Sequence, residues 1–252
     1  LVFRITRKGA PGIDPLPEGI PEELWWTDRL PSVSMNHYPN GDRNMNMLPT
    51  MEGDEFMRLG YAAAREECTR RVYAYWRRLQ ATKDEFFHYR ISWIAPELGV
   101  RESYRIIGEH VLTQHDLLAG LSGREHDDTI AIADHAMDTH GPSTGRQGCA
   151  ELSEPYGVPF RCLIPKGFRN LLIASRAASF SSIAASSCRT SRTMMQLGQA
   201  AGTAAFVSRQ AGVDVCDAPP AGLRAALLDQ NVALEWPMRP GLIEHLQHED
   251  AA

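Results

Sequence analysis

Residues 156–207 constrain the fold of this chain more than any other stretch. They predict a short strand, a turn, a buried strand at 171–174, a polar loop and a long alanine-rich helix. A continuous apolar run such as 171–174 is typical of a strand covered on both faces. From Thr193 onward the helix is apolar all round, so we expect it to be buried. Gly198 and Gly202 leave one of its faces without side chains, and a sheet or a cofactor can lie close to that face.

Two arginines, Arg189 and Arg192, stand where this helix is expected to begin. A helix N-terminus carries unpaired N–H groups and a partial positive charge, so cations are disfavoured there. A bound anion would remove the conflict, and Thr190, Ser191 and Thr193 supply capping hydroxyls and further donors. The stretch therefore predicts an anion-binding cradle. The alternative is a pair of solvated arginines beside an ordinary Ser/Thr helix cap.

Three blocks of sequence carry a family resemblance. They are GVRESYRIIGEHVLTQHDLLAG at 99–120, YGVPFRCLIPKGFRNLL at 156–172, and the run NLLIASR, SSCRTSRTMM and LGQAAGTAA within 170–205. Together they resemble the FAD-dependent oxidoreductases of the large glutathione-reductase-like flavoprotein class, in particular the xanthan-lyase-like group. Two positions depart from the pattern: Ser175 stands where the family usually has glycine, and Arg192 where it often has proline.

The resemblance implies an α/β fold, made of the C-terminal part of a Rossmann-like FAD domain and a mixed α+β substrate domain. It also implies FAD as the cofactor. Matching the family motif to this sequence gives the expected cofactor-binding residues: Arg176, Arg189, Thr190, Ser191, Arg192, Thr193 and Met194. In the block at 99–120, Arg101, Glu102, Arg105 and Glu109 are expected either in a buried charged network or against the FAD phosphates.

The G-x-G-x-x-G turn that opens flavoproteins of this class occurs nowhere in the sequence, which begins at Leu1 rather than methionine. We therefore expect the C-terminal half of a flavoenzyme, either as a cleaved or truncated product or in a heteromer with a second chain that carries the N-terminal FAD-binding half. The expected domains are an arm and part of the substrate-binding domain at 1–98, a connecting segment and the rest of that domain at 99–155, the C-terminal part of the FAD-binding domain at 156–215, and a C-terminal helix and tail at 216–252.

The first hundred residues predict a small sheet and one long helix. We expect a strand at 1–6, a proline-punctuated extended arm, a hairpin at 37–49 turning at Asn40 and Gly41, and, within the run 86–99, a buried strand that Pro96 ends. Apolar residues at helical intervals predict a helix at 54–80, with its arginines and glutamates on a solvated face. The hairpin suits a substrate-binding sheet, and the polar residues that would contact substrate there are His37, Asp42, Asn44 and Asn46.

Histidines and carboxylates gather in residues 124–142. Their spacing fits no standard metal motif, so we expect no metal site. Instead, a strand at 130–137 is expected to carry Asp138 and His140 toward the active site. The pKa of histidine suits proton transfer at neutral pH, which makes His140 the candidate catalytic base. The alternative is a surface histidine before a Gly-Pro turn.

Composition narrows the class of partner. The net charge of -5 and the pI near 6.0 give no reason to expect nucleic acid or an anionic membrane surface. No apolar run approaches the roughly 18 residues of a membrane span. The five cysteines are odd in number and lack CxxC spacing, which favours a reducing compartment, and we expect a cytoplasmic protein.

These observations lead to one functional hypothesis and one alternative. The hypothesis is a component of an FAD-dependent oxidoreductase that oxidises a polar small molecule, a sugar or a hydroxylated organic acid, by hydride transfer to flavin. The alternative is a noncatalytic interaction subunit that stabilises a flavoprotein partner. Ser175 and the missing glycine-rich turn favour the alternative.

Overall fold

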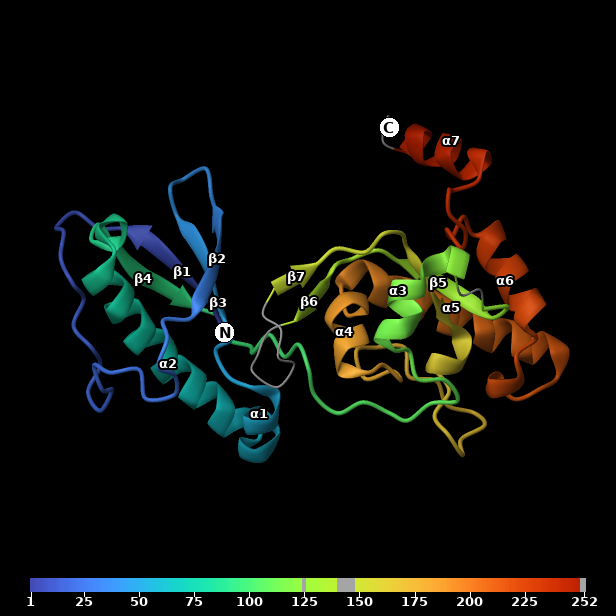
Figure 1. Ribbon diagram of the computed structural model, residues 1–252, viewed down its shortest axis with the longest axis horizontal. Helices are drawn as coiled ribbons and strands as arrows, with labels where there is room; N and C mark the ends of the chain where they lie inside the picture. The colour runs from blue at the N-terminus through green and yellow to red at the C-terminus, as the bar shows by residue number, and fades with distance from the viewer. Residues whose placement is uncertain (124–125, 140–147, 250–252) are drawn as a thin grey trace. The chain divides into compact units, whose positions relative to one another are not determined.

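The computed structural model describes residues 1–123, 126–139 and 148–249 and divides the chain into two compact units (Figure 1). Unit 1 is Leu1–Val100 and unit 2 is Arg101–Ala252. Each unit has a hydrophobic core of its own. The fold is of the α/β type, with helices and small antiparallel sheets in the described residues.

Unit 1 is built on an antiparallel sheet with the strand order β2-β3-β1-β4. Side chains alternate along β1, so that Phe3 and Ile5 face the core, where Tyr75 and Trp76 of the long helix α2 also lie. The strand at 1–6 and the hairpin turn at Asn40 and Gly41 are therefore confirmed, but the first strand of the hairpin begins at Ser32, before the predicted range of 37–49. Gly41 has the positive φ of 88° that the turn needs. The elements are β1 (Val2–Arg7), β2 (Ser32–His37), β3 (Arg43–Leu48), α1 (Gly53–Leu59), α2 (Tyr61–Thr82), η1 (Asp84–Phe86) and β4 (Tyr89–Ile94).

Two expectations for this unit are wrong in part. The helix predicted at 54–80 is broken at Gly60, whose φ of 76° and ψ of 166° end α1 before α2 begins. Only glycine adopts such a conformation at low cost, and an apolar periodicity carries no sign of the break. The strand predicted as buried at 86–99 is the shorter β4, in which only Tyr89 is buried. Because β4 is an edge strand, most of its residues remain accessible.

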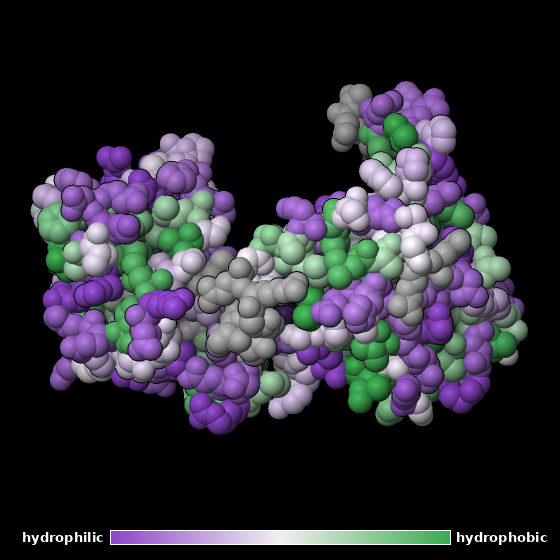
Figure 2. Space-filling view, viewed as in Figure 1, coloured by the Kyte–Doolittle hydropathy of each residue, from purple (hydrophilic) through white to green (hydrophobic). Residues whose placement is uncertain are grey.

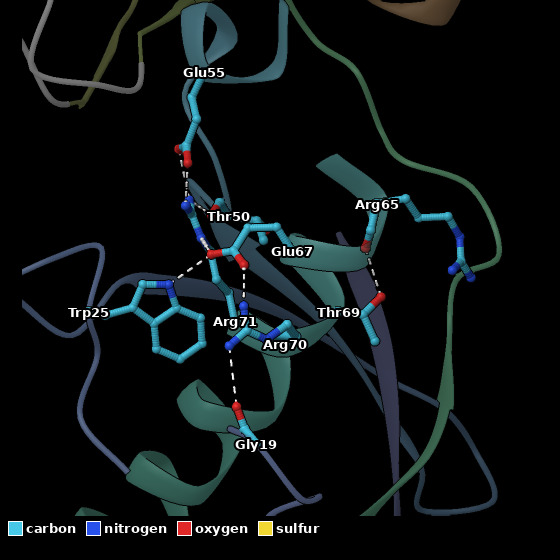
Figure 3. Close-up of polar contacts among 9 residues, drawn as sticks. All are labelled: Gly19, Trp25, Thr50, Glu55, Arg65, Glu67, Thr69, Arg70 and Arg71. Atoms are coloured by element: carbon cyan, nitrogen blue, oxygen red, sulfur yellow. Dashed lines mark hydrogen bonds and ion pairs between the residues drawn. The ribbon is translucent and has the colours of Figure 1, made fainter. Parts of the chain in front are cut away.

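The charged residues of α2 do not all form a solvated face. Arg71 is buried and donates to Glu55, to Glu67 and to the carbonyl of Thr50 (Figure 3). Trp25 of the proline-rich arm donates its indole N–H to the same Glu67 at 2.8 Å. The arm at 8–31 contains neither helix nor strand, as expected, and this network helps to hold it against the unit.

Unit 2 contains, within its described residues, two short antiparallel strand pairs and several helices. One hydrophobic core draws on all three segments predicted for this part of the chain: Leu117 comes from 99–155, Leu197 from 156–215 and Leu223 from 216–252. β5 pairs with β8, and β6 pairs with β7. The elements are α3 (Gln114–Gly123), β5 (Thr129–Ala133), β6 (Met137–Thr139), β7 (Gly148–Ala150), β8 (Tyr156–Pro159), η3 (Phe160–Cys162), α4 (Ser182–Cys188), α5 (Ser191–Ala211), η4 (Val215–Asp217), α6 (Pro220–Asp229) and α7 (Pro240–Glu249).

The central stretch differs from its prediction at three places. Residues 171–174 form no strand, and their backbone contact to the rest of the unit is the bond from Ile173 N to Leu163 O. The polar loop is in fact the helix α4, capped by the Ser181 side chain, which accepts from Ala184 N. The helix α5 is buried on one face only, because Met195 is 72% exposed and both Gly198 and Gly202 face open space.

Two further elements of unit 2 also depart from expectation. The strand predicted at 130–137 is divided into β5 and β6, and the polar tail contains the helix α7, whose Leu242 is buried. Among the described residues, none of the helices is long and apolar enough to cross a membrane. The cysteines Cys68, Cys149, Cys162, Cys188 and Cys216 are free thiols.

Apolar side chains also reach the surface of unit 2, as the green atoms in Figure 2 show. Several of them are large and far more exposed than the core residues beside them in sequence. They belong to the segment after Arg101, to the loop before residues 171–174, and to the open face of α5: Tyr104 75%, Ile107 69%, Phe168 56%, Met195 72% and Phe206 62%.

Candidate functional site

The candidate site centres on one carboxylate between two arginines in unit 2. Asp138 lies in β6, Arg189 follows the last residue of α4, and Arg101 opens the unit. The Asp138 Oδ2 atom is 3.5 Å from Arg101 Nη1 and 3.5 Å from Arg189 Nη2. These residues line a small pocket of about 60 Å³ together with Glu102, Thr139, Ser182, Ala185 and Ser186. Such a volume suits a few waters or one small anionic group rather than a whole cofactor.

Two arginines and two carboxylates line this pocket, so their formal charges balance. Burial, and then the nearby charges of Arg101 and Arg176, lower the pKa of Arg189, while Asp138 opposes that shift. An arginine stays protonated at physiological pH, so the lowered pKa reports chiefly the burial of its charge. The Nη1 atom of Arg101 is buried and makes no hydrogen bond within the described residues. An anion placed here would gain charge-assisted hydrogen bonds.

Arg189 does not stand in the first turn of α5, as the sequence suggested. It is the C-cap residue of α4, where the partial negative charge of a helix end favours a cation. Of the two arginines, only Arg192 therefore lies at the positively charged end of a helix. Arg192 does lie in the first turn of α5, where it pairs with Asp134 at 2.6 Å, both side chains being 56% exposed.

The other predicted cofactor-binding residues do not line the pocket at Asp138, and they differ from one another in burial. Thr190 is the N-cap residue of α5, but its side chain does not cap the helix and lies 3.2 Å from the Thr193 hydroxyl. The N–H groups of the first turn therefore have no side-chain cap. Thr193 is buried, Met194 is half-buried against the core, and Ser191 is exposed. Arg176 lies in an exposed turn and reaches the pocket through its charge.

The structure adds residues that the sequence did not single out. Ser182 and Ser186 lie four apart on α4 and face the same pocket. Their spacing would have indicated a shared face, had the segment been predicted as a helix rather than a loop. Cys188 also adjoins Arg189, but burial raises the pKa of its thiol to about 12, so it is no nucleophile at neutral pH. The predicted base His140 lies outside the described residues.

The comparison with known families defines the class of protein. The chain is an oxidoreductase that uses FAD. It belongs to the family of FAD dependent oxidoreductases, whose model matches residues 4–227. No curated protein and no solved structure shows significant similarity to it. The match gives no support to the noncatalytic alternative.

The residues present fit a cofactor with anionic groups. FAD carries a pyrophosphate, and the pocket offers the buried donor Arg101 Nη1 beside the guanidinium of Arg189. The uncapped N–H groups at the start of α5 are a second set of donors for negative charge. Further along α5, a Cβ atom built on Gly198 or Gly202 would meet nothing within 4 Å, so another group can approach the helix backbone there.

Proposed function

We propose that this chain is the C-terminal component of an FAD-dependent oxidoreductase that oxidises a polar small molecule, a sugar or a hydroxylated organic acid. The single observation that carries the proposal is the pocket in which Arg101 and Arg189 flank Asp138, in a chain of this family. When bound, the flavin accepts a hydride from a substrate C–H bond. The blocks at 99–120 and 156–205 support membership of the glutathione-reductase-like class and its xanthan-lyase-like group.

The role of the chain is to supply fixed positive charge. The N–H groups at Ser191, Arg192 and Thr193 point out of the first turn of α5, and Arg189 precedes them in the chain. Donors held by the fold stabilise developing negative charge without reorganising, which favours the reduced state of a cofactor bound beside them. Arg189, which is largely buried, contributes more to this field than Arg192, which is screened by water and paired with Asp134.

We further propose that His140 takes up the substrate proton. Oxidation of a hydroxylated carbon to a carbonyl removes one hydride from carbon and one proton from oxygen. A neutral imidazole accepts that proton near pH 7. Asp138 and Thr139, which precede His140 in the chain, line the pocket with Arg189, and this supports the assignment.

The same proposal includes a heteromer. The sequence contains no G-x-G-x-x-G turn, and the N-terminal FAD-binding half of a Rossmann-like domain would come either from a second chain or from a segment that precedes these residues. Three features of unit 2 support a partner that packs there: the extended segment 171–174, the open glycine face of α5, and the exposed side chains of Ile107 and Phe168. A strand added beside 171–174 would convert that segment into the buried strand that its sequence predicts.

Substitution of Arg189 tests the cofactor assignment. We expect Arg189→Ala to weaken flavin retention by the purified assembly about tenfold or more, because one charge-assisted contact is lost. Arg78→Ala is the matched control, since Arg78 is exposed on α2 of unit 1. The measurement is flavin absorbance per chain after gel filtration. Equal flavin content in the two variants would refute the role of Arg189.

Substitution of His140 tests the base. We expect His140→Ala to leave FAD bound and to slow flavin reduction by substrate about a hundredfold or more, the usual loss for a general base. Stopped-flow absorbance of the reductive half-reaction measures that rate. An unchanged rate would remove His140 from the mechanism.

A further inference from the structure

Unit 2 contains a second polar cluster that the oxidoreductase site does not use. It consists of His110, Asp116 and His126, which come from three separate segments of the chain. The Asp116 Oδ1 atom lies 3.8 Å from His110 Nε2 and 3.7 Å from His126 Nε2, and the three atoms all lie within 4.8 Å of one another. The side chains of Asp116 and His126 are only 3% and 8% exposed.

Local structure aims the Asp116 carboxylate at the two rings. Thr113 precedes α3, and its backbone N–H and hydroxyl both donate to Asp116 Oδ2, at 2.7 and 2.8 Å. This is the reciprocal half of a capping box, which fixes the carboxylate by one oxygen and leaves the other directed at the histidines. A ligating carboxylate held in this way by a hydrogen-bonded neighbour is a recurrent feature of metal sites.

The two histidines are positioned by backbone contacts. His110 N donates to Arg161 O at 3.3 Å, which places the 101–113 segment beside η3. His126 lies in the turn before β5, where its carbonyl accepts from both the N–H and the hydroxyl of Thr129. The ring centroids are 5.1 Å apart and the planes are inclined at 66°, so the rings do not stack face to face.

The contacts of the Asp116 Oδ1 atom with the two rings are not hydrogen bonds. Separations of 3.7 and 3.8 Å exceed the range of a nitrogen–oxygen hydrogen bond. His126 Nε2 is buried and makes no hydrogen bond to any described residue. Burying such an atom without a partner costs free energy, and a bound cation would remove that cost.

We propose that His110, Asp116 and His126 bind a divalent transition-metal ion of the Zn²⁺ type. Zinc–ligand bonds of about 2.0 to 2.2 Å in a tetrahedron place the ligand atoms about 3.4 Å apart. The two separations to Asp116 Oδ1 therefore need to contract by only a few tenths of an ångström. Two imidazoles and one carboxylate match the ligand preferences of such ions and leave one position for a further ligand.

The ion would join three segments that meet in unit 2. His110 belongs to the long segment that begins at Arg101, Asp116 to α3, and His126 to the turn before β5. This is a structural role, distinct from the pocket at Asp138. This site could not be predicted from the sequence, because the spacing of residues 110, 116 and 126 fits no standard motif and the three residues meet only in the folded chain.

Metal analysis of matched histidine variants tests the proposal. The full chain is stripped with a chelator, dialysed against Zn²⁺, and analysed for bound metal by mass spectrometry. We expect about one equivalent in the wild type and at least a tenfold weaker affinity in His126→Gln and His110→Gln, because each lacks one ligand. His115→Gln is the control, since His115 is exposed on α3 next to Asp116. Equal binding by the wild type and His126→Gln would overturn the proposal.

A spectroscopic measurement keeps the test valid if a variant fails to fold. Circular dichroism identifies such a variant, and the wild type alone is then titrated with Co²⁺. Strong visible absorption, typical of four-coordinate Co²⁺, is expected. Weak absorption or no binding would overturn the proposal.

Discussion

Replacement of Arg71 by methionine tests the physical account of unit 1. The Arg71 guanidinium is 5% exposed and donates to Glu67 Oε1 and Glu55 Oε2 at 3.0 Å and to Thr50 O at 3.1 Å, with a further bond to Glu55 Oε1. Methionine preserves much of the aliphatic volume and removes all the donors. Both glutamates would then be left without this partner (Figure 3).

The expected loss follows from the burial of the groups left behind. Removing one partner of a buried ion pair costs about 3 to 5 kcal/mol. Glu55 and Glu67 remain 26% and 17% exposed, so water can solvate part of their charge. We therefore expect the lower end of that range, about 3 kcal/mol.

Urea unfolding followed by tryptophan fluorescence measures this loss. The indoles of Trp25, Trp26 and Trp76 belong to unit 1, so the signal reports chiefly on that unit. Arg70→Met is the control: Arg70 is adjacent on α2 but 41% exposed, and loss of its pair with Glu67 should cost less than about 1 kcal/mol. An Arg71→Met variant within about 1 kcal/mol of the wild type would refute the reasoning.

Two further predictions concern unit 2. Burial alone would raise the pKa of Asp128, but hydrogen bonds from Arg161 lower it below its usual range. The ion pair therefore stabilises the fold fully above about pH 4, and this stabilisation is lost as the pH falls and Asp128 becomes protonated. Asp128→Asn should therefore cost about 1 to 2 kcal/mol at pH 7, a difference that shrinks in urea titrations below pH 4. Gly198→Ala should stabilise the isolated chain by about 0.5 to 1 kcal/mol through helix propensity, yet lower the flavin content of the assembly. A gain in stability with unchanged flavin content would contradict the proposed use of the open face of α5.

Much of unit 1 could be predicted because local signals specify it. The hairpin follows from Asn40 and Gly41, whose turn conformation is a property of those residues. The break at Gly60 could not be predicted, because a glycine within an apolar periodicity is compatible with a continuous helix. The burial of Arg71 depends on Glu55 and Thr50, which reach it only in the folded unit.

The candidate site in unit 2 was harder to predict. Arg189 was identified from its sequence, but its role as the C-cap of α4 was missed because a run of serine and alanine predicts a loop as readily as a short helix. Residues 171–174 have the apolar pattern of a buried strand, and among the described residues nothing pairs with them as a strand. A pattern of hydrophobicity indicates that a segment will be covered but does not identify what covers it.

Native mass spectrometry of the protein isolated from its source tests the central claim most directly, because it weighs the intact assembly and any bound cofactor together. The account predicts a complex that contains this chain, a second chain and the mass of one FAD. A chain that carries neither a partner nor FAD would contradict the claim that it supplies the arginine-lined pocket of a divided flavoenzyme.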